Sequence, residues 1–214
     1  MLHKEPQIIS SKTFSLIQEL QAIPQLKEFY LVGGTALALQ LGHRNSIDID
    51  LFTQNDFDSK KMAEFLAERF TVRVDHVFTN TLLANIIDIK VDFVKRSYPY
   101  LKEPTTEEAI TFLSKEDIAA MKLNAIVGSG QRLKDFIDVY FLLEYFSVED
   151  MLGFYEKKYI NSNPLIVLKA LSYFDDIDEA IESPQLLKPL PVKKVKQRIS
   201  KAVFKTNKVF KSGE

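Results

Sequence analysis

Hydrophobic residues in the first hundred positions switch between the spacing of a helix and the spacing of a strand. Apolar residues every three or four positions predict helices at 13–23, 35–41 and 59–69. Alternation or short apolar runs predict strands at 29–32, 46–52, 71–77, 81–87 and 89–94. Strands and helices in this order indicate a mixed β-sheet with helices packed on a face.

The pattern changes after Pro99 and Pro104. Apolar stripes at helical spacing then predict helices at 114–127, 133–146, 147–159 and 164–174, and from 192 to about 209. We therefore predict an α+β protein in two domains. Residues 1–104 hold the mixed β-sheet, and residues 105–214 form an all-helical C-terminal half.

Two aspartates stand out in the strand predicted at 46–52. Its alternation places Ile47, Ile49 and Leu51 on one face and Ser46, Asp48 and Asp50 on the other. Asp48 and Asp50 can then converge on a pair of Mg²⁺ ions about 3.5–4 Å apart. Asp92, on the polar face of the strand at 89–94, offers a third carboxylate. The alternative is that the two aspartates form only the solvated face of an edge strand.

A glycine pair, Gly33-Gly34, precedes these carboxylates, with thirteen residues between Gly34 and Asp48. Glycines fit a tight turn from strand to helix, and they let phosphate oxygens approach the first N–H groups of the helix. Thr35 can cap this helix or offer its hydroxyl to a phosphate. Arg44 can contact a phosphate or pair with a carboxylate, and together with Ser46 it completes the candidate nucleotide-binding set.

Composition narrows the chemistry further. The chain has no cysteine, which excludes disulfides and thiolate metal sites, and only three histidines, which disfavours a zinc site. A metal site is therefore expected to use carboxylates. The N-terminus lacks the apolar core of a signal peptide, and no apolar run approaches the ~18 residues that span a bilayer. We expect a soluble cytoplasmic protein that does not contact a membrane.

Charge is distributed unevenly along the chain. The net charge of −1 conceals eight Lys or Arg residues, and no acidic residue, between positions 192 and 213. Such a basic segment, here 192–211, either contacts nucleic acid or packs against the acidic remainder of the protein.

Two blocks of sequence resemble a known family. Gly33-Gly34, Asp48-Ile49-Asp50-Leu51 and a later strand aspartate, Asp92, are similar to the signature of the DNA polymerase β-like nucleotidyltransferase superfamily. Within it, the run from Leu31 to Phe52 resembles the abortive-infection AbiEii/AbiGii toxin family. The second block contains Lys122, Arg132, Asp135 and Asp138, and is similar to the helical motif of that family. The resemblance implies a nucleotidyltransferase fold.

The resemblance also implies roles for the residues of both blocks. Asp48 and Asp50 would bind metal, and Lys122 would bind the triphosphate. Asp135 or Asp138, three apart on one helix face, would orient Lys122, the base or the acceptor. The helical domain would complete the active-site cleft. A Lys122–Asp138 ion pair that only joins two helices is the alternative.

Together these features predict a metal-dependent nucleotidyltransferase that moves a nucleotide from an NTP to an acceptor and releases pyrophosphate. Asp92 would assist the acceptor-side metal and take the hydroxyl proton. The resemblance suggests the toxin of a bacterial toxin–antitoxin or phage-defence system, with RNA or tRNA as acceptor and a cognate antitoxin as partner. A small-molecule or protein acceptor, or a non-catalytic nucleotide-binding module, stays open.

Overall fold

The computed structural model describes residues 1–178 and 184–214, and the chain divides into two compact units. The sheet unit contains residues 1–98 and 104–113, and the helical unit contains residues 99–103 and 114–214. The division therefore differs from the single expected boundary at residue 104. Residues 105–113 were expected in the helical half but form two strands of the sheet, and the preceding linker 99–103 belongs with the helices.

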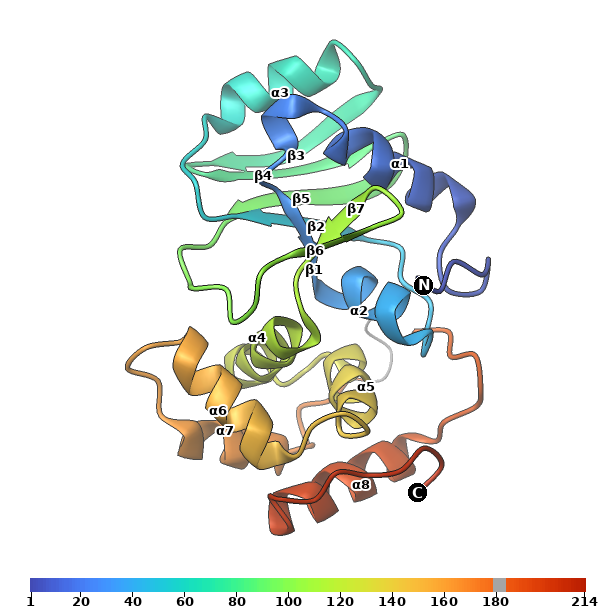
Figure 1. Cartoon of the computed structure of the whole chain (residues 1–214), viewed down its shortest axis with the longest axis vertical. Coiled ribbons are helices and arrows are strands. Elements are labelled where there is room, and N and C mark those ends of the chain that lie inside the picture. Colours follow the sequence, from blue (N-terminus) through green and yellow to red (C-terminus); the bar gives the residue numbers. More distant parts are fainter. Residues whose placement is uncertain (179–183) are drawn as a thin grey trace. The chain divides into compact units, whose positions relative to one another are not determined.

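The sheet unit is built on a mixed sheet of seven strands, which confirms the predicted α+β class (Figure 1). The strands are β1 (Tyr30–Val32), β2 (Ile49–Thr53), β3 (Val72–Phe78), β4 (Thr81–Ile86), β5 (Ile89–Lys95), β6 (Thr105–Glu107) and β7 (Ile110–Phe112). Their order is β3-β4-β5-β2-β1-β7-β6. The pairs β2–β5 and β1–β7 are parallel, and the other pairs are antiparallel.

Capping residues mark the ends of several helices in the sheet unit. The helices are α1 (Ser11–Gln21), a short 3₁₀ helix (Pro24–Leu26), α2 (Gly33–Leu41) and α3 (Ser59–Ala67). Side chains of Ser10 and Asp58 cap α1 and α3 by accepting backbone N–H groups. Gly42 ends α2 in the left-handed conformation, with a φ of 63°.

The strand expected at 46–52 begins three residues later, at Ile49. The backbone N–H of Ser46 donates to the carbonyl of Ile8, and the carbonyl of Asp48 accepts the hydroxyl of Thr35, so the segment follows a loop. The predicted alternation is correct from Ile49 onward, where Ile49 is fully buried. It is wrong for Ile47, which is 67% exposed.

The hairpin formed by β6 and β7 was not expected from the sequence. Its two turn residues, Glu108 and Ala109, both have positive φ, at 51° and 60°. Such turns usually carry Asn, Asp or Gly, so Glu-Ala gives no turn signal. The N-terminal region supports this turn, because Lys4 pairs with the Glu108 carboxylate and Gln18 donates to the Glu108 carbonyl.

The helical unit contains the five helices that the sequence predicts, with ends shifted by a few residues. They are α4 (Lys115–Gly128), α5 (Leu133–Leu142), α6 (Val148–Lys158), α7 (Pro164–Leu171) and α8 (Val192–Phe204). The expected end near residue 209 was too late, because α8 stops at Phe204. No helix in the described parts of the chain is long and apolar enough to cross a membrane.

A buried ion pair fixes the linker to the helical unit. Lys158 on α6 lies 2.7 Å from the Asp117 carboxylate on α4, and its ammonium also donates to the carbonyl of Pro99. The Asp117 carboxylate accepts the backbone N–H of Leu101 at 3.0 Å. These bonds explain why residues 99–103 pack with the helices although they precede β6.

Candidate active site

The strongest candidate site lies where β2 and β5 run parallel. In this register Asp50 of β2 is the direct partner of Asp92 of β5. Register partners on adjacent strands have Cα atoms about 4.8 Å apart and point their side chains to the same face. Both aspartates are partly buried, and Asp48 lies two residues before Asp50 in the preceding loop. Two of the three expected carboxylates are therefore neighbours across the sheet.

Lys90 is a further charged residue of this site that the sequence analysis did not single out. It lies two residues before Asp92 on the same face of β5, and its ammonium is 3.4 Å from the Asp92 carboxylate. Its charge also acts on Asp48 and Asp50. The spacing Lys90–Asp92 was the signal that could have identified it, since residues two apart on a strand share a face.

Burial and neighbouring charges have opposing effects on the pKa values of Asp92 and Lys90. Burial raises the pKa of Asp92, Lys90 acts to lower it, and the Asp48 carboxylate raises it further. Burial alone would lower the pKa of Lys90, but Asp92, Asp48 and Asp50 together hold it above its usual value. The site is therefore one in which negative charge is costly unless a cation is close.

Both glycines of the Gly33-Gly34 turn lie in close contact with a charged side chain. Gly33 has a φ of 69°, and a Cβ there would collide with the Asp50 carboxylate. A Cβ at Gly34 would collide with the guanidinium of Arg44, a side chain that is only 3% exposed. The first turn of α2 thus lies directly against Asp50 and Arg44. The N-cap of α2, Val32, offers no side-chain acceptor to the N–H groups of that turn.

Thr35 and Ser46 hold the loop that carries Asp48. Thr35 is buried, its hydroxyl donates to the Asp48 carbonyl, and it lies 2.8 Å from the Ser46 hydroxyl. Thr35 therefore ties this loop to the first turn of α2 instead of capping the helix. In this conformation its hydroxyl is engaged with the protein, so the structure gives it a positioning role.

The donor set fits a divalent cation that is completed by other ligands. Among the described residues, no group of three His, Cys, Asp or Glu side chains is close enough to hold a metal ion on its own. One oxygen of Asp92, Oδ1, is buried and accepts no hydrogen bond from the described part of the protein. Mg²⁺ typically takes one or two carboxylates and fills its octahedron with water and phosphate oxygens. A buried carboxylate oxygen beside Asp50 is suited to that role.

The second sequence block forms a separate cluster within the helical unit. The ammonium of Lys122 on α4 lies 2.8 Å from Asp135 and 2.7 Å from Asp138, both on α5. Arg132 pairs with the other oxygen of Asp135 at 2.9 Å. Lys122, Asp135 and Asp138 are all buried. Lys122 lies beside both aspartates, and Arg132 joins them through Asp135. The Lys122–Asp138 ion pair joins two helices, which was the alternative interpretation of this block.

Comparison with known proteins identifies the family of this chain. The family described as nucleotidyl transferase AbiEii toxin, type IV TA system, matches residues 15–186. The chain belongs to this family of nucleotidyltransferase toxins. An uncharacterised protein of Aquifex aeolicus (strain VF5) is 33% identical to it over 171 residues, covering 77% of this chain and 82% of the relative.

Solved structures share the fold. MenT4, a nucleotidyltransferase toxin from Mycobacterium tuberculosis H37Rv, aligns with a TM-score of 0.61 and 13% identity, covering 91% of this chain and 82% of the MenT4 chain. A candidate nucleotidyltransferase from Helicobacter pylori aligns with a TM-score of 0.58 and 17% identity, covering 92% of both chains. The predicted nucleotidyltransferase fold is therefore confirmed.

Family membership establishes the activity at a general level. The protein is a nucleotidyltransferase of a toxin–antitoxin family, which implies an NTP as substrate and an antitoxin as partner. The expected enzyme class and family are thus confirmed. The individual site residues, the metal and the acceptor rest on the geometry above.

Proposed function

We propose that this protein is a metal-dependent toxin that transfers a nucleotide from an NTP to RNA, tRNA included, and releases pyrophosphate. The observation that carries the metal assignment is the pairing of Asp50 with Asp92 across β2 and β5, with a buried Asp92 oxygen that no described residue satisfies. The biological setting is a bacterial toxin–antitoxin or phage-defence system. MenT4, a nucleotidyltransferase toxin of the same fold, supports that setting.

The sheet unit supplies the groups for the chemical step. Asp48, Asp50 and Asp92 would hold Mg²⁺, with two ions as the working hypothesis. When bound, Mg²⁺ would neutralise negative charge on the phosphates and lower the pKa of the acceptor hydroxyl. The acceptor oxygen bonds to the α-phosphorus while the bond from that phosphorus to the β-phosphate oxygen breaks. Asp92 would accept the hydroxyl proton, a role that its position opposite Asp50 allows.

The first turn of α2 is assigned to the triphosphate. The backbone N–H groups at Gly33, Gly34 and Thr35 begin a helix without a side-chain cap, and helix N-termini favour anions. Arg44, held against Gly34, adds a guanidinium that matches phosphate geometry. Ser46 and Thr35 keep the Asp48 loop in position.

The roles of the second block rest on the family resemblance together with its geometry. We assign Lys122 to binding the triphosphate, and Asp135 and Asp138 to orienting its ammonium. Contacts of 2.8 and 2.7 Å from Lys122 to these two carboxylates support the orienting role.

The test is transfer of label from α-³²P-NTP. Each of the four NTPs is incubated with the protein, Mg²⁺ and total RNA, and products are separated as RNA, protein and small molecules. We expect label in RNA, abolished by EDTA and by Asp50→Asn or Asp92→Asn. The matched control is Asp88→Asn, an exposed turn residue on the same hairpin, whose φ of 63° suits asparagine.

Two results would contradict the proposal. Label found only in protein or in a small molecule would show that RNA is not the acceptor. Transfer that survives both Asp50→Asn and Asp92→Asn would show that the carboxylate pair is not the metal site.

A further inference from the structure

A groove within the helical unit, about 750 Å³ in volume, lies between α8 and Phe174, three residues after the end of α7. Its remaining lining comes from the first three turns of α8 and is mainly basic or polar: Val192, Lys193, Lys196, Gln197, Ser200 and Lys201. No acidic residue belongs to this lining in the part of the chain that the structure describes. We call it the α8 groove.

The opposite face of α8 is fixed to the protein. Val195, Ile199 and Ala202 are buried, and the buried guanidinium of Arg198 donates to the carbonyl of Tyr140 and to Glu144, at 3.1 and 2.8 Å. The segment after α8 folds back along the helix, where Arg198 also donates to the carbonyl of Glu214 (Figure 1). The lysine face is therefore held outward by a well-packed helix.

The lysines of the groove are not held in ion pairs by described residues, and only Lys201 is close enough to a described carboxylate to add to the effect of Lys208 in lowering its pKa, that of Glu214. Lys193, Lys196 and Lys201 form no ion pair with any residue in the described ranges, whereas Arg198 and Lys208 each pair with a carboxylate. The ammonium of Lys196 lies 5.9 Å from the centre of the Phe174 ring. Asp175 and Asp176, which follow Phe174, are not part of the groove lining. Three such cations around an open groove favour a polyanion.

We propose that the α8 groove binds the sugar–phosphate backbone of the RNA acceptor, an inference that rests on the function proposed above. Lys193 and Lys201 are eight residues apart, about 12 Å along a helix, so the groove can contact more than one phosphate. Phe174, half-buried at its edge, offers a ring on which a base can stack. A lipid surface fits less well, because the apolar face of α8 is buried in the protein.

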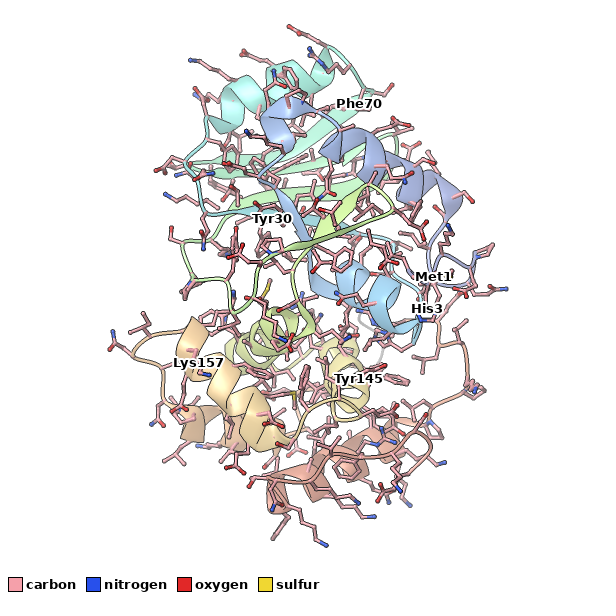
Figure 2. All side chains as sticks on the ribbon, in the orientation of Figure 1. Met1, His3, Tyr30, Phe70, Tyr145 and Lys157 are labelled. Atoms are coloured by element: carbon pink, nitrogen blue, oxygen red, sulfur yellow. The ribbon has the colours of Figure 1, made fainter. Side chains whose placement is uncertain are left out.

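The test measures RNA binding without NTP. Fluorescence anisotropy of a labelled single-stranded RNA is followed across a KCl series for the full chain and for K193Q/K196Q/K201Q. The matched control is K157Q/K169Q/K188Q, which removes the same charge from exposed lysines of the same unit; Figure 2 labels Lys157 on α6. Thermal melting confirms that both triple variants fold.

We expect the α8 variant to bind RNA at least tenfold more weakly. The slope of log affinity against log salt should fall by about 2, because each phosphate contact to a single strand contributes about 0.7. The control variant should keep the wild-type slope. Phe174→Ala should weaken binding several-fold with the slope unchanged, since stacking releases no counterions.

Equal losses in both triple variants, or an unchanged slope in the α8 variant, would overturn the groove assignment. So would α8-dependent binding of anionic vesicles or polyglutamate without binding of RNA. The experiment can contradict the groove assignment and the RNA acceptor assignment independently. If the α8 lysines govern RNA binding but no RNA becomes labelled, the acceptor assignment is wrong. If the α8 variant labels RNA normally at subsaturating RNA, only the groove assignment is wrong.

Discussion

The two charged clusters of this protein differ in how deeply their side chains are buried and in how nearly their positive and negative charges cancel. In the sheet unit, Asp48, Asp50 and Asp92 share the nearby charge of Lys90, and one Asp92 oxygen has no donor among the described residues. In the helical unit, Lys122 and Arg132 match Asp135 and Asp138, and three of these four side chains are buried. The first arrangement is suited to taking up a cation, whereas the second already satisfies its own charges.

This difference separates two consequences of mutation. A carboxylate that is positioned to bind a cation contributes to activity and little to folding. A buried charge that is already paired contributes to folding in addition to any role in substrate binding, because removing one partner leaves the other without compensation. The predictions below test that separation, beginning with the largest effect.

Asp50→Asn should abolish transfer, by about a thousandfold or more in kcat/KM, because one of the two adjacent carboxylates at the β2–β5 pairing is lost. Its urea unfolding midpoint should stay close to that of the wild type. Single-turnover transfer and urea unfolding monitored by circular dichroism measure both quantities. If the variant lost activity only because it was unfolded, the proposed difference between the two clusters would be wrong.

Lys122→Met should destabilise the protein by about 3–5 kcal/mol, because Asp135 and Asp138 then remain buried without their shared cation. Chemical unfolding with Lys157→Met as control measures this effect, since Lys157 is exposed. Adding Asp138→Leu to Lys122→Met should restore part of the loss. A near-neutral single variant would contradict the structural role of this ion pair.

Gly34→Ala should raise the KM for NTP about tenfold, because its Cβ occupies the position of the Arg44 guanidinium and displaces it from the first turn of α2. The control is Gly153→Ala on α6, where an added Cβ meets nothing within 4 Å. Steady-state kinetics over an NTP series separates KM from kcat. An unchanged KM would show that the contact between Arg44 and Gly34 does not affect the NTP.

The smallest effect concerns pH. Asp92 has a raised pKa from burial, so its contribution to stability is present at low pH and is lost as the pH rises through its folded-state pKa. Lys90 opposes that rise, and Lys90→Gln should therefore raise the pKa of Asp92 further. In EDTA, the melting temperature of Lys90→Gln should fall below that of the wild type as the pH rises above the acidic range. Parallel profiles would indicate that Lys90 does not act on Asp92.

Local patterns in the sequence located much of the fold and part of the site. Helices with capping residues were found within a few residues, since caps such as Ser114 and Ser147 act on their own first turn. Gly33-Gly34 was correctly placed at the start of a helix. The strand start at Ile49 and the hairpin at Glu108-Ala109 were missed, because contacts from Ile8, Thr35, Lys4 and Gln18 decide those conformations.

The sequence by itself determined which residues have the chemistry for a metal and a triphosphate: a glycine pair, two aspartates one residue apart, and a second block around Lys122. Only the tertiary structure decided that Asp50 lies opposite Asp92 with Lys90 beside them, and that the lysines of α8 surround a groove. The physical reason is that the spacing of hydrophobic residues depends on local structure and predicts which residues near in sequence share a face. The pairing of strands forty residues apart depends instead on which surfaces bury the most apolar area and satisfy the most backbone hydrogen bonds.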